Sequence, residues 1–132
     1  DGYELIANFG RELFSSTDIS YQASDNNPSN KKIRLPLGTG RNIILICKEL
    51  LHNILQHAGA KTVTLAMEIT SYKQICITIS DNGCGFDKEH LVPTGNGLRN
   101  MQNRAKRLNG KLELDSNINV GTTSQVIFPI PG

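Results

Sequence analysis

The sequence contains no tryptophan, and only 5% of its 132 residues are aromatic. Few side chains are therefore available to stack on bases, and a formal net charge of +2 is too small to attract a polyanion strongly. The longest uninterrupted apolar run, Ile43–Cys47, is far shorter than the ~20 residues that a membrane-spanning helix needs. We expect neither nucleic acid nor a membrane as a partner of this domain.

Cysteine is also scarce. Cys47, Cys76 and Cys84 show no Cys-x-x-Cys spacing, and two of the three lie in otherwise apolar segments. This usage favours reduced thiols and a cytoplasmic location, and leaves open whether the parent protein is membrane-anchored. The three histidines lack the spacing of a zinc site, so transition-metal catalysis is not expected.

An initiator methionine and a signal segment are missing as well, because the sequence begins at Asp1. We therefore expect a piece of a longer protein. A chain of this length buries roughly two-thirds of its unfolded surface, which suffices for one core.

Apolar periodicity predicts the elements of that core. Helical spacing predicts helices over about 3–14, 40–58 and 98–108, with stops at Gly59 and at Asn109-Gly110. Alternation predicts strands near 19–21, over 63–69 and 75–80, and a closing hairpin of 112–114 with 126–130. Strands that alternate have one face in the core, so we expect an α+β two-layer sandwich: a mixed, mostly antiparallel sheet with helices on one face.

One polar stripe runs along the long helix. Glu49, Asn53 and His57 are spaced by four residues, so each step advances only about 40° around the helix and all three share one side. Carboxylate and amide oxygens suit Mg²⁺, which also takes waters and substrate phosphates. The alternative is an ordinary solvated flank.

A glycine-rich turn follows the strand 75–80. Asp81 ends the strand, and Gly83 and Gly85 come next. Asn-Gly is a common hairpin turn, but the charged stretch 87–90 and Pro93 do not resemble a partner strand. The functional interpretation is that Asp81 accepts a hydrogen bond from a ligand amine while the glycines admit a flat ring.

A second glycine pair, Gly95 and Gly97, opens the helix 98–108. The free N–H groups and partial positive charge of such an end suit a phosphate, although a plain helix cap explains the glycines equally well. The pair lacks the third glycine of a dinucleotide fingerprint and follows a loop, so a Rossmann interpretation fails. The basic run 99–111 is typical of a solvated helix face.

Taken in order, these signals resemble the Bergerat (GHKL) nucleotide-binding fold shared by gyrase, heat-shock chaperones, histidine kinases and mismatch-repair ATPases. Residues 48–60 (KELLHNILQHAGA) resemble the N box of sensor histidine kinases, particularly the subfamily that pairs with NarL-type response regulators. The stretches 81–86, 95–101 with Arg104, and 121–123 resemble the three glycine boxes. The resemblance covers about residues 40–131.

This resemblance implies ATP and Mg²⁺ as cofactors. It implies that Asn53 binds Mg²⁺, that Glu49 polarises or orients groups near the γ-phosphate, and that Asp81 takes the adenine amino group. Thr122 would support the adenine through its hydroxyl. Gly83 and Gly85 would flank the adenine ring, and Gly95 and Gly97 would let a short lid, about residues 87–96, fold over the phosphates. The resemblance also implies that His57 and Leu98 contribute to the ATP-binding site.

The resemblance further implies a domain that donates the γ-phosphoryl group to a histidine on a dimerisation domain, and no segment here resembles that acceptor. Residues 1–30 would be the end of an upstream helix and a linker, and 31–132 the ATP-binding catalytic domain, monomeric in isolation. Gln56 stands where the family more often has lysine or arginine. Two alternatives stay open: a serine kinase of the anti-sigma-factor type, and a non-catalytic nucleotide-binding module.

Overall fold

The computed structural model of the protein describes residues 2–25, 37–55, 59–70, 73–83, 96–117 and 121–130. Its elements follow the predicted order of helices and strands. They are α1 Gly2–Phe14, β1 Ser20–Asp25, α2 Leu37–Asn53, β2 Thr62–Ile69, β3 Gln74–Asp81, α3 Asn96–Arg107, β4 Lys111–Asn117 and β5 Gly121–Pro129.

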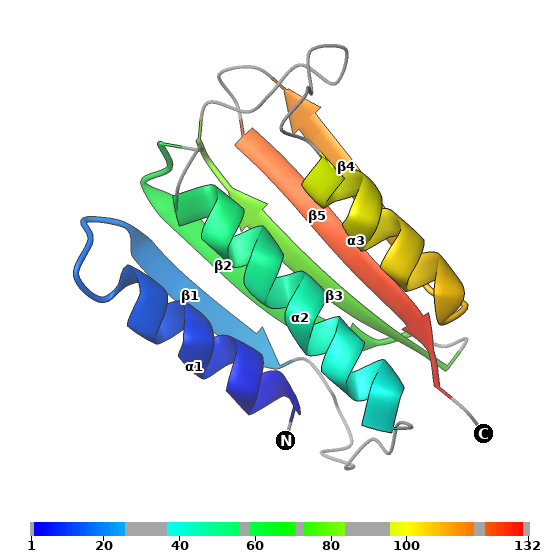
Figure 1. Ribbon diagram of the computed structural model, residues 1–132. Coiled ribbons are helices and arrows are strands. Elements are labelled where there is room, and N and C mark those ends of the chain that lie inside the picture. Colours follow the sequence, from blue (N-terminus) through cyan, green and yellow to red (C-terminus); the bar gives the residue numbers. More distant parts are fainter. Residues whose placement is uncertain are drawn as a thin grey trace.

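The strands form one sheet with the order β1-β2-β3-β5-β4. Strands β1 and β2 pair in parallel, whereas the pairs β2–β3, β3–β5 and β5–β4 are antiparallel. Figure 1 shows α1, α2 and α3 side by side against the same face of this sheet. The fold is therefore the expected α+β sandwich with a mixed, mostly antiparallel sheet and helices on one face.

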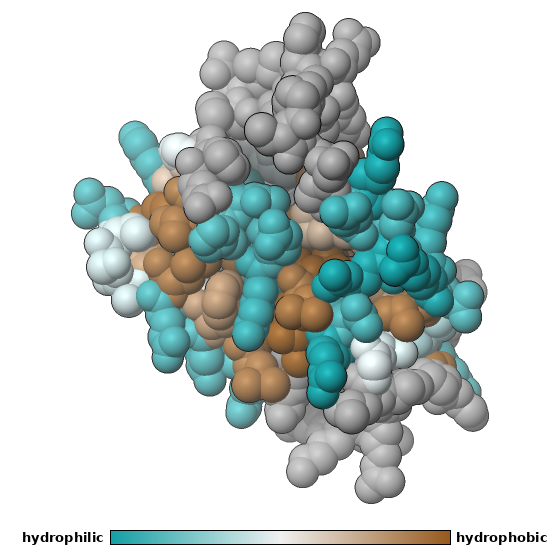
Figure 2. All heavy atoms as spheres, in the orientation of Figure 1, coloured by the Kyte–Doolittle hydropathy of each residue, from teal (hydrophilic) through white to brown (hydrophobic). Residues whose placement is uncertain are grey.

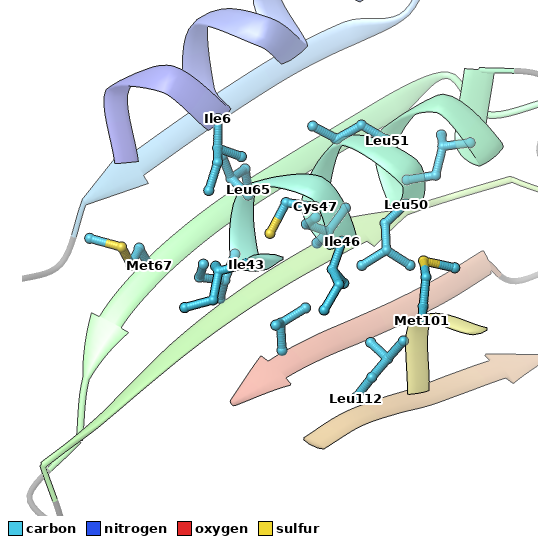
Figure 3. Packing of buried hydrophobic residues seen from close by; sticks show 14 of the residues in the cluster. Ile6, Ile43, Ile46, Cys47, Leu50, Leu51, Leu65, Met67, Met101 and Leu112 are labelled. Atoms are coloured by element: carbon cyan, nitrogen blue, oxygen red, sulfur yellow. The ribbon is translucent and has the colours of Figure 1, made fainter. Parts of the chain in front are cut away.

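The core fills the space between the helices and the sheet. Figure 3 shows Ile6 of α1, Ile46 and Leu51 of α2, and Met101 of α3 pointing toward the strands. Inward positions of β2, β3 and β5 alternate with outward ones, as the period of a strand requires. Burying this apolar face is the main force that holds the two layers together.

The helix-bearing face of the molecule is a mixture of hydrophilic and hydrophobic side chains (Figure 2). In the described part of the chain, the exposed large apolar side chains are Leu5 at 58% and Leu45 at 43%. Leu5 belongs to the predicted apolar arc of the first helix but lies at its solvent edge. None of the described helices has the length and apolarity that crossing a membrane would take.

The residues predicted to stop two of the helices have left-handed backbone conformations. Gly59 has a φ of 59°, and Asn109, just after α3, has a φ of 62°. The N–H of Gly110 then donates to the carbonyl of Ala105 at 2.9 Å. The α-helical part of the long helix ends earlier than predicted, at Asn53, and a π-helical turn follows at 54–55; residues 56–58 lie outside the described ranges.

The first 25 residues contribute to the common core. Tyr21 of β1 lies over Gly10, where a methyl group would overlap the tyrosine ring, and its hydroxyl donates to the Ala7 carbonyl at 3.2 Å. Burial raises the pKa of Tyr21 to about 12. The domain boundary expected near residue 30 stays a prediction, although α1 and β1 pack as part of the same two layers.

Cys47 and Cys76 are free thiols, and both are buried. Desolvation raises the pKa of Cys47 to about 12, so this thiol is unreactive at neutral pH. Cys76 is only 5% exposed although its strand neighbours predict an outward position. It lies on the central strand β3 between Glu68 and Ile127 in register, so side chains of both flanking strands cover it.

Candidate functional site

The inward face of the sheet changes character at one end. Along most of the sheet, the residues that face the helices in register are apolar, as in the row Met67, Ile77 and Val126. At the end of β3 the register instead aligns three polar residues on adjacent strands. They are Asp81 on β3, Thr122 on β5 and Ser116 on β4, and we call them the polar row.

Asp81 is held by backbone donors. Its Oδ1 accepts a hydrogen bond from the N–H of Gly83 at 2.8 Å, and the N–H of Thr122 also donates to the carboxylate. Partial burial raises the pKa of Asp81 above its ordinary value, against the opposing effect of these two hydrogen bonds. The carboxylate is therefore fixed in place yet partly desolvated, which makes it a strong acceptor for a ligand donor.

Asn82 joins the end of β3 to the start of β2. Its Oδ1 accepts hydrogen bonds from the N–H groups of both Lys61 and Thr62 at 2.8 Å, and its own N–H donates to the Thr62 carbonyl at 3.3 Å. These bonds tie Asn82 to the start of β2. Asn82 therefore anchors the turn that carries Asp81.

Gly121 brings β5 against this turn. Its φ is 135°, a left-handed conformation that glycine adopts readily, and a Cβ added here would overlap the carbonyl oxygen of Asp81. Gly121 is buried, as is Gly83. Gly121 thus allows the backbones of β3 and β5 to approach each other closely at the polar row.

Thr122 lies directly opposite Asp81 on one side and Ser116 on the other. Its Oγ1 is 2.8 Å from the Oγ of Ser116, and either oxygen can be the donor. Ser116 Oγ also donates to the Gly121 carbonyl at 3.4 Å. The threonine hydroxyl is therefore held between two strands beside the Asp81 carboxylate.

The long helix ends above the same end of the sheet. The chain leaves α2 at Asn53 and re-enters the sheet at Thr62, whose successor Val63 pairs with Asp81. Figure 1 shows the end of α2 and the start of α3 lying toward this end. Glu49 is exposed and Asn53 is half-buried, so both carry oxygens that a ligand can reach.

Helix α3 begins toward the same end of the sheet (Figure 1). Its backbone begins at Asn96 and includes Gly97 and Leu98 in the first turn, which holds no acidic residue. The partial positive charge of this helix end is therefore not offset by a carboxylate of the same turn. The cationic side chains of α3 and of the first residue of β4 are exposed: Arg99, Arg104, Lys106, Arg107 and Lys111.

The structure thus brings the predicted site residues Asp81, Gly83 and Thr122 together, and directs the α2 end with Asn53 and the α3 start with Gly97 toward them. Of the remaining predicted site residues, Glu49 lies on α2 and Leu98 on α3, and the others lie outside the described ranges. They are His57, Gly85 and Gly95, together with Gln56 and all of the predicted lid except Asn96. In the part of the chain that is described, no three His, Cys, Asp or Glu side chains are grouped to hold a metal ion.

Sequence reasoning missed two residues. Asn82 looked like an ordinary turn residue, and nothing local indicates its bonds to a strand that starts some 20 positions earlier. Ser116 did carry a signal, because alternation from Leu112 and Leu114 predicts an inward position there. A polar residue at an inward position marks either a binding surface or a packing defect.

Comparisons with known proteins identify the family of this chain. The family model of the histidine kinase-, DNA gyrase B- and HSP90-like ATPases matches residues 38–132. The chain is 32% identical over 100 residues to the sensor histidine kinase YdfH of Bacillus subtilis, covering 74% of this chain and 25% of that protein. It is 30% identical over 124 residues to the oxygen sensor histidine kinase NreB of Staphylococcus carnosus, covering 93% of this chain and 32% of that protein.

Among solved structures, the histidine kinase domain of the blue-light activated histidine kinase EL346 from Erythrobacter litoralis matches with a TM-score of 0.79 at 23% identity. The match covers 98% of this chain and 60% of that one. The chain spans between a quarter and a third of the length of the two sensor kinases above. By sequence and fold, the chain belongs to the HATPase_c family of histidine kinase-, DNA gyrase B- and HSP90-like ATPases.

Proposed function

We propose that this chain binds Mg-ATP at the polar row and is the catalytic domain of a sensor histidine kinase. In this role it donates the γ-phosphoryl group to a histidine of a dimerisation domain outside the chain. The observation that carries the proposal is the register of β3, β5 and β4, which aligns Asp81, Thr122 and Ser116 on the helix-covered face. The family membership and the sensor-kinase relatives support it.

The base would bind at the polar row. Asp81 is fixed by the Gly83 N–H and partly desolvated, so it would accept a hydrogen bond from the adenine amino group. The Thr122 hydroxyl would support the adenine from the neighbouring strand, and Gly83 and Gly85 would flank the ring. A guanine presents a carbonyl oxygen in place of that amine, so the carboxylate would repel it.

The phosphates would lie between the end of α2 and the start of α3. The residues present fit a magnesium ion, because Asn53 offers an amide oxygen and the exposed Glu49 a carboxylate one turn before it. We propose Asn53 as the protein ligand and Glu49 as the group that orients the reaction near the γ-phosphate. Mg²⁺ supplies charge neutralisation when bound. Gly95, Gly97, Leu98 and His57 would complete the ATP site.

Phosphoryl transfer depends mainly on positioning and charge neutralisation, so this domain needs no nucleophile of its own. The bond from the γ-phosphorus to the bridging oxygen of ADP breaks, and a bond to a ring nitrogen of the acceptor histidine forms. We further propose that the parent protein signals to a response regulator of the NarL type from the cytoplasm.

Calorimetry with a non-hydrolysable ATP analogue tests the site. We expect the chain to bind the magnesium complex of AMP-PNP, Asn53→Asp to abolish the magnesium-dependent part of binding, and Asp81→Asn to weaken the preference for adenine over guanine. Asn42→Asp is the matched control, because it makes the same change near the other end of α2. Unchanged affinity in both site variants would contradict the assignment.

A transfer assay tests the reaction. The chain is mixed with radiolabelled ATP and with a dimerisation domain from a sensor kinase relative. Acid-labile label on the acceptor histidine supports the proposal, and acid-stable label on a serine of an added substrate would instead indicate the serine kinase alternative. Binding of Mg-ATP with no transfer to any acceptor would favour a non-catalytic module.

A further inference from the structure

A pair of hydroxyl groups links the edge strand β4 to its neighbour β5 at the polar row. Ser116 of β4 and Thr122 of β5 are directly opposite in register, and their side-chain oxygens are 2.8 Å apart. Ser116 also donates to the carbonyl of Gly121, the residue before Thr122. These two contacts of Ser116 converge on the segment that carries Thr122.

Ser116 occupies the third inward position of β4. The preceding inward residues of β4 are Leu112 and Leu114, and Leu112 is buried. A hydroxyl at the third inward position removes apolar contact area, so packing alone does not account for a serine here. The short contact with Thr122 accounts for the serine, because the rotatable hydroxyl of Thr122 must be fixed before it can recognise a ligand.

A second hydroxyl pair gives an internal comparison. Ser80 and Thr123 are the sequence neighbours of Asp81 and Thr122, they are also opposite in register, and their hydroxyls are 3.4 Å apart. Because side chains alternate along a strand, this pair lies on the other face of the sheet, away from the helices. The two pairs share chemistry and strand β5, and they differ in the face they occupy.

We propose that Ser116 is a positioning residue for adenine recognition: it fixes the Thr122 hydroxyl in the orientation that contacts the base beside Asp81. This inference rests on the proposed function, since it assigns a role within the same nucleotide site. Ser116 does not touch the nucleotide itself, and its effect passes through Thr122.

The experiment measures the affinity of the chain for Mg-AMP-PNP and for its guanine counterpart, Mg-GMP-PNP, by calorimetry. We expect Ser116→Ala to weaken AMP-PNP binding by about 3- to 10-fold, as for the loss of one hydrogen bond, and to leave GMP-PNP binding unchanged. Ser116→Thr retains the hydroxyl and should restore adenine affinity. Ser80→Ala, the matched control on the opposite face, should change neither affinity.

A double-mutant cycle separates positioning from general support of the fold. In a Thr122→Val background, Ser116→Ala should have no further effect on AMP-PNP binding, because the group it positions is gone. Equal loss of both nucleotides in Ser116→Ala, or the same loss with and without Thr122, would overturn the inference. So would wild-type affinity in Ser116→Ala.

These outcomes are distinct from a failure of the proposed function. If the unaltered chain binds AMP-PNP and Asp81→Asn weakens it while Ser116→Ala does not, the ATP site stands and only the role of Ser116 is wrong. If the unaltered chain binds no nucleotide, both proposals are wrong. Melting temperatures of all variants, recorded without ligand, show whether each one is folded.

Discussion

Strands β3 and β5 pair in one continuous register along the helix-covered face of the sheet, but their inward side chains are apolar at one end and polar at the other. At the apolar end, defined by Ile75, Ile77, Val126 and Phe128, all four side chains are at most 4% exposed. At the other end, the same two strands carry Asp81 and Thr122. One alternating pattern thus builds a core where its inward residues are apolar and a ligand surface where they are polar.

The largest stability loss is expected at the apolar end. Phe128 is fully buried, and its ring lies so close to Gly110 that a Cβ there would overlap it. Phe128→Ala should lower the free energy of unfolding by about 3–5 kcal/mol, measured by urea denaturation. Ile127→Ala, the adjacent half-buried residue on the open face, should cost clearly less. Equal losses would show that the two faces do not differ in packing.

A substitution at the polar end should affect stability and binding together. Gly121→Ala places a methyl group against the Asp81 carbonyl at a φ of 135°, so we expect a loss of about 1–3 kcal/mol and weaker AMP-PNP binding. Gly59→Ala is the control, because Gly59 also has a positive φ but open space around it. It should lower stability without changing affinity. Unchanged nucleotide affinity in Gly121→Ala would show that the close backbone contact between β3 and β5 is not needed for nucleotide binding.

The parts of this comparison that depend on local pattern were predictable from the sequence. Alternation over 63–69 and 75–80 marks β2 and β3, and the left-handed residues Gly59 and Asn109 lie where helix stops were predicted. Asp81 was predicted to end its strand, and β3 does end at Asp81. Each of these features is set by residues within one helical turn or a few strand positions.

The rest depends on pairing between distant segments. Asn82 reaches Lys61, 21 positions earlier in the chain, only because β2 and β3 are antiparallel neighbours. The parallel pairing of β1 with β2 likewise joins segments more than 40 residues apart. No local pattern specifies such partners, because a one-residue shift would send every side chain to the other face.

The anchor beside Asp81 should have an intermediate effect. Asn82→Ala removes the acceptor for two backbone N–H groups, but the site is exposed and water can replace the lost bonds, so we expect about 0.5–1.5 kcal/mol in urea denaturation. Asn82→Asp keeps an acceptor oxygen and should lose less. We also expect Asn82→Ala to weaken AMP-PNP binding, because the turn that presents Asp81 loses its tie to β2. A loss of stability with unchanged AMP-PNP affinity would show that the hydrogen bonds between Asn82 and β2 are not needed to position Asp81 for binding.

The smallest effect should appear as a pH dependence at Asp81. Its pKa in the folded protein is raised by partial burial, so the carboxyl group favours folding most when it is protonated. That contribution is fully present below the ordinary aspartate pKa of about 3.9 and is lost as the pH rises through the higher folded-state value. The stability of wild type relative to Asp81→Asn, measured by urea denaturation without ligand, should therefore fall as the pH is raised from 3.5 to 7. A relative stability that instead rises with pH would mean that the charged carboxylate is favoured in the fold, and that the polar end holds Asp81 as tightly as a salt bridge would.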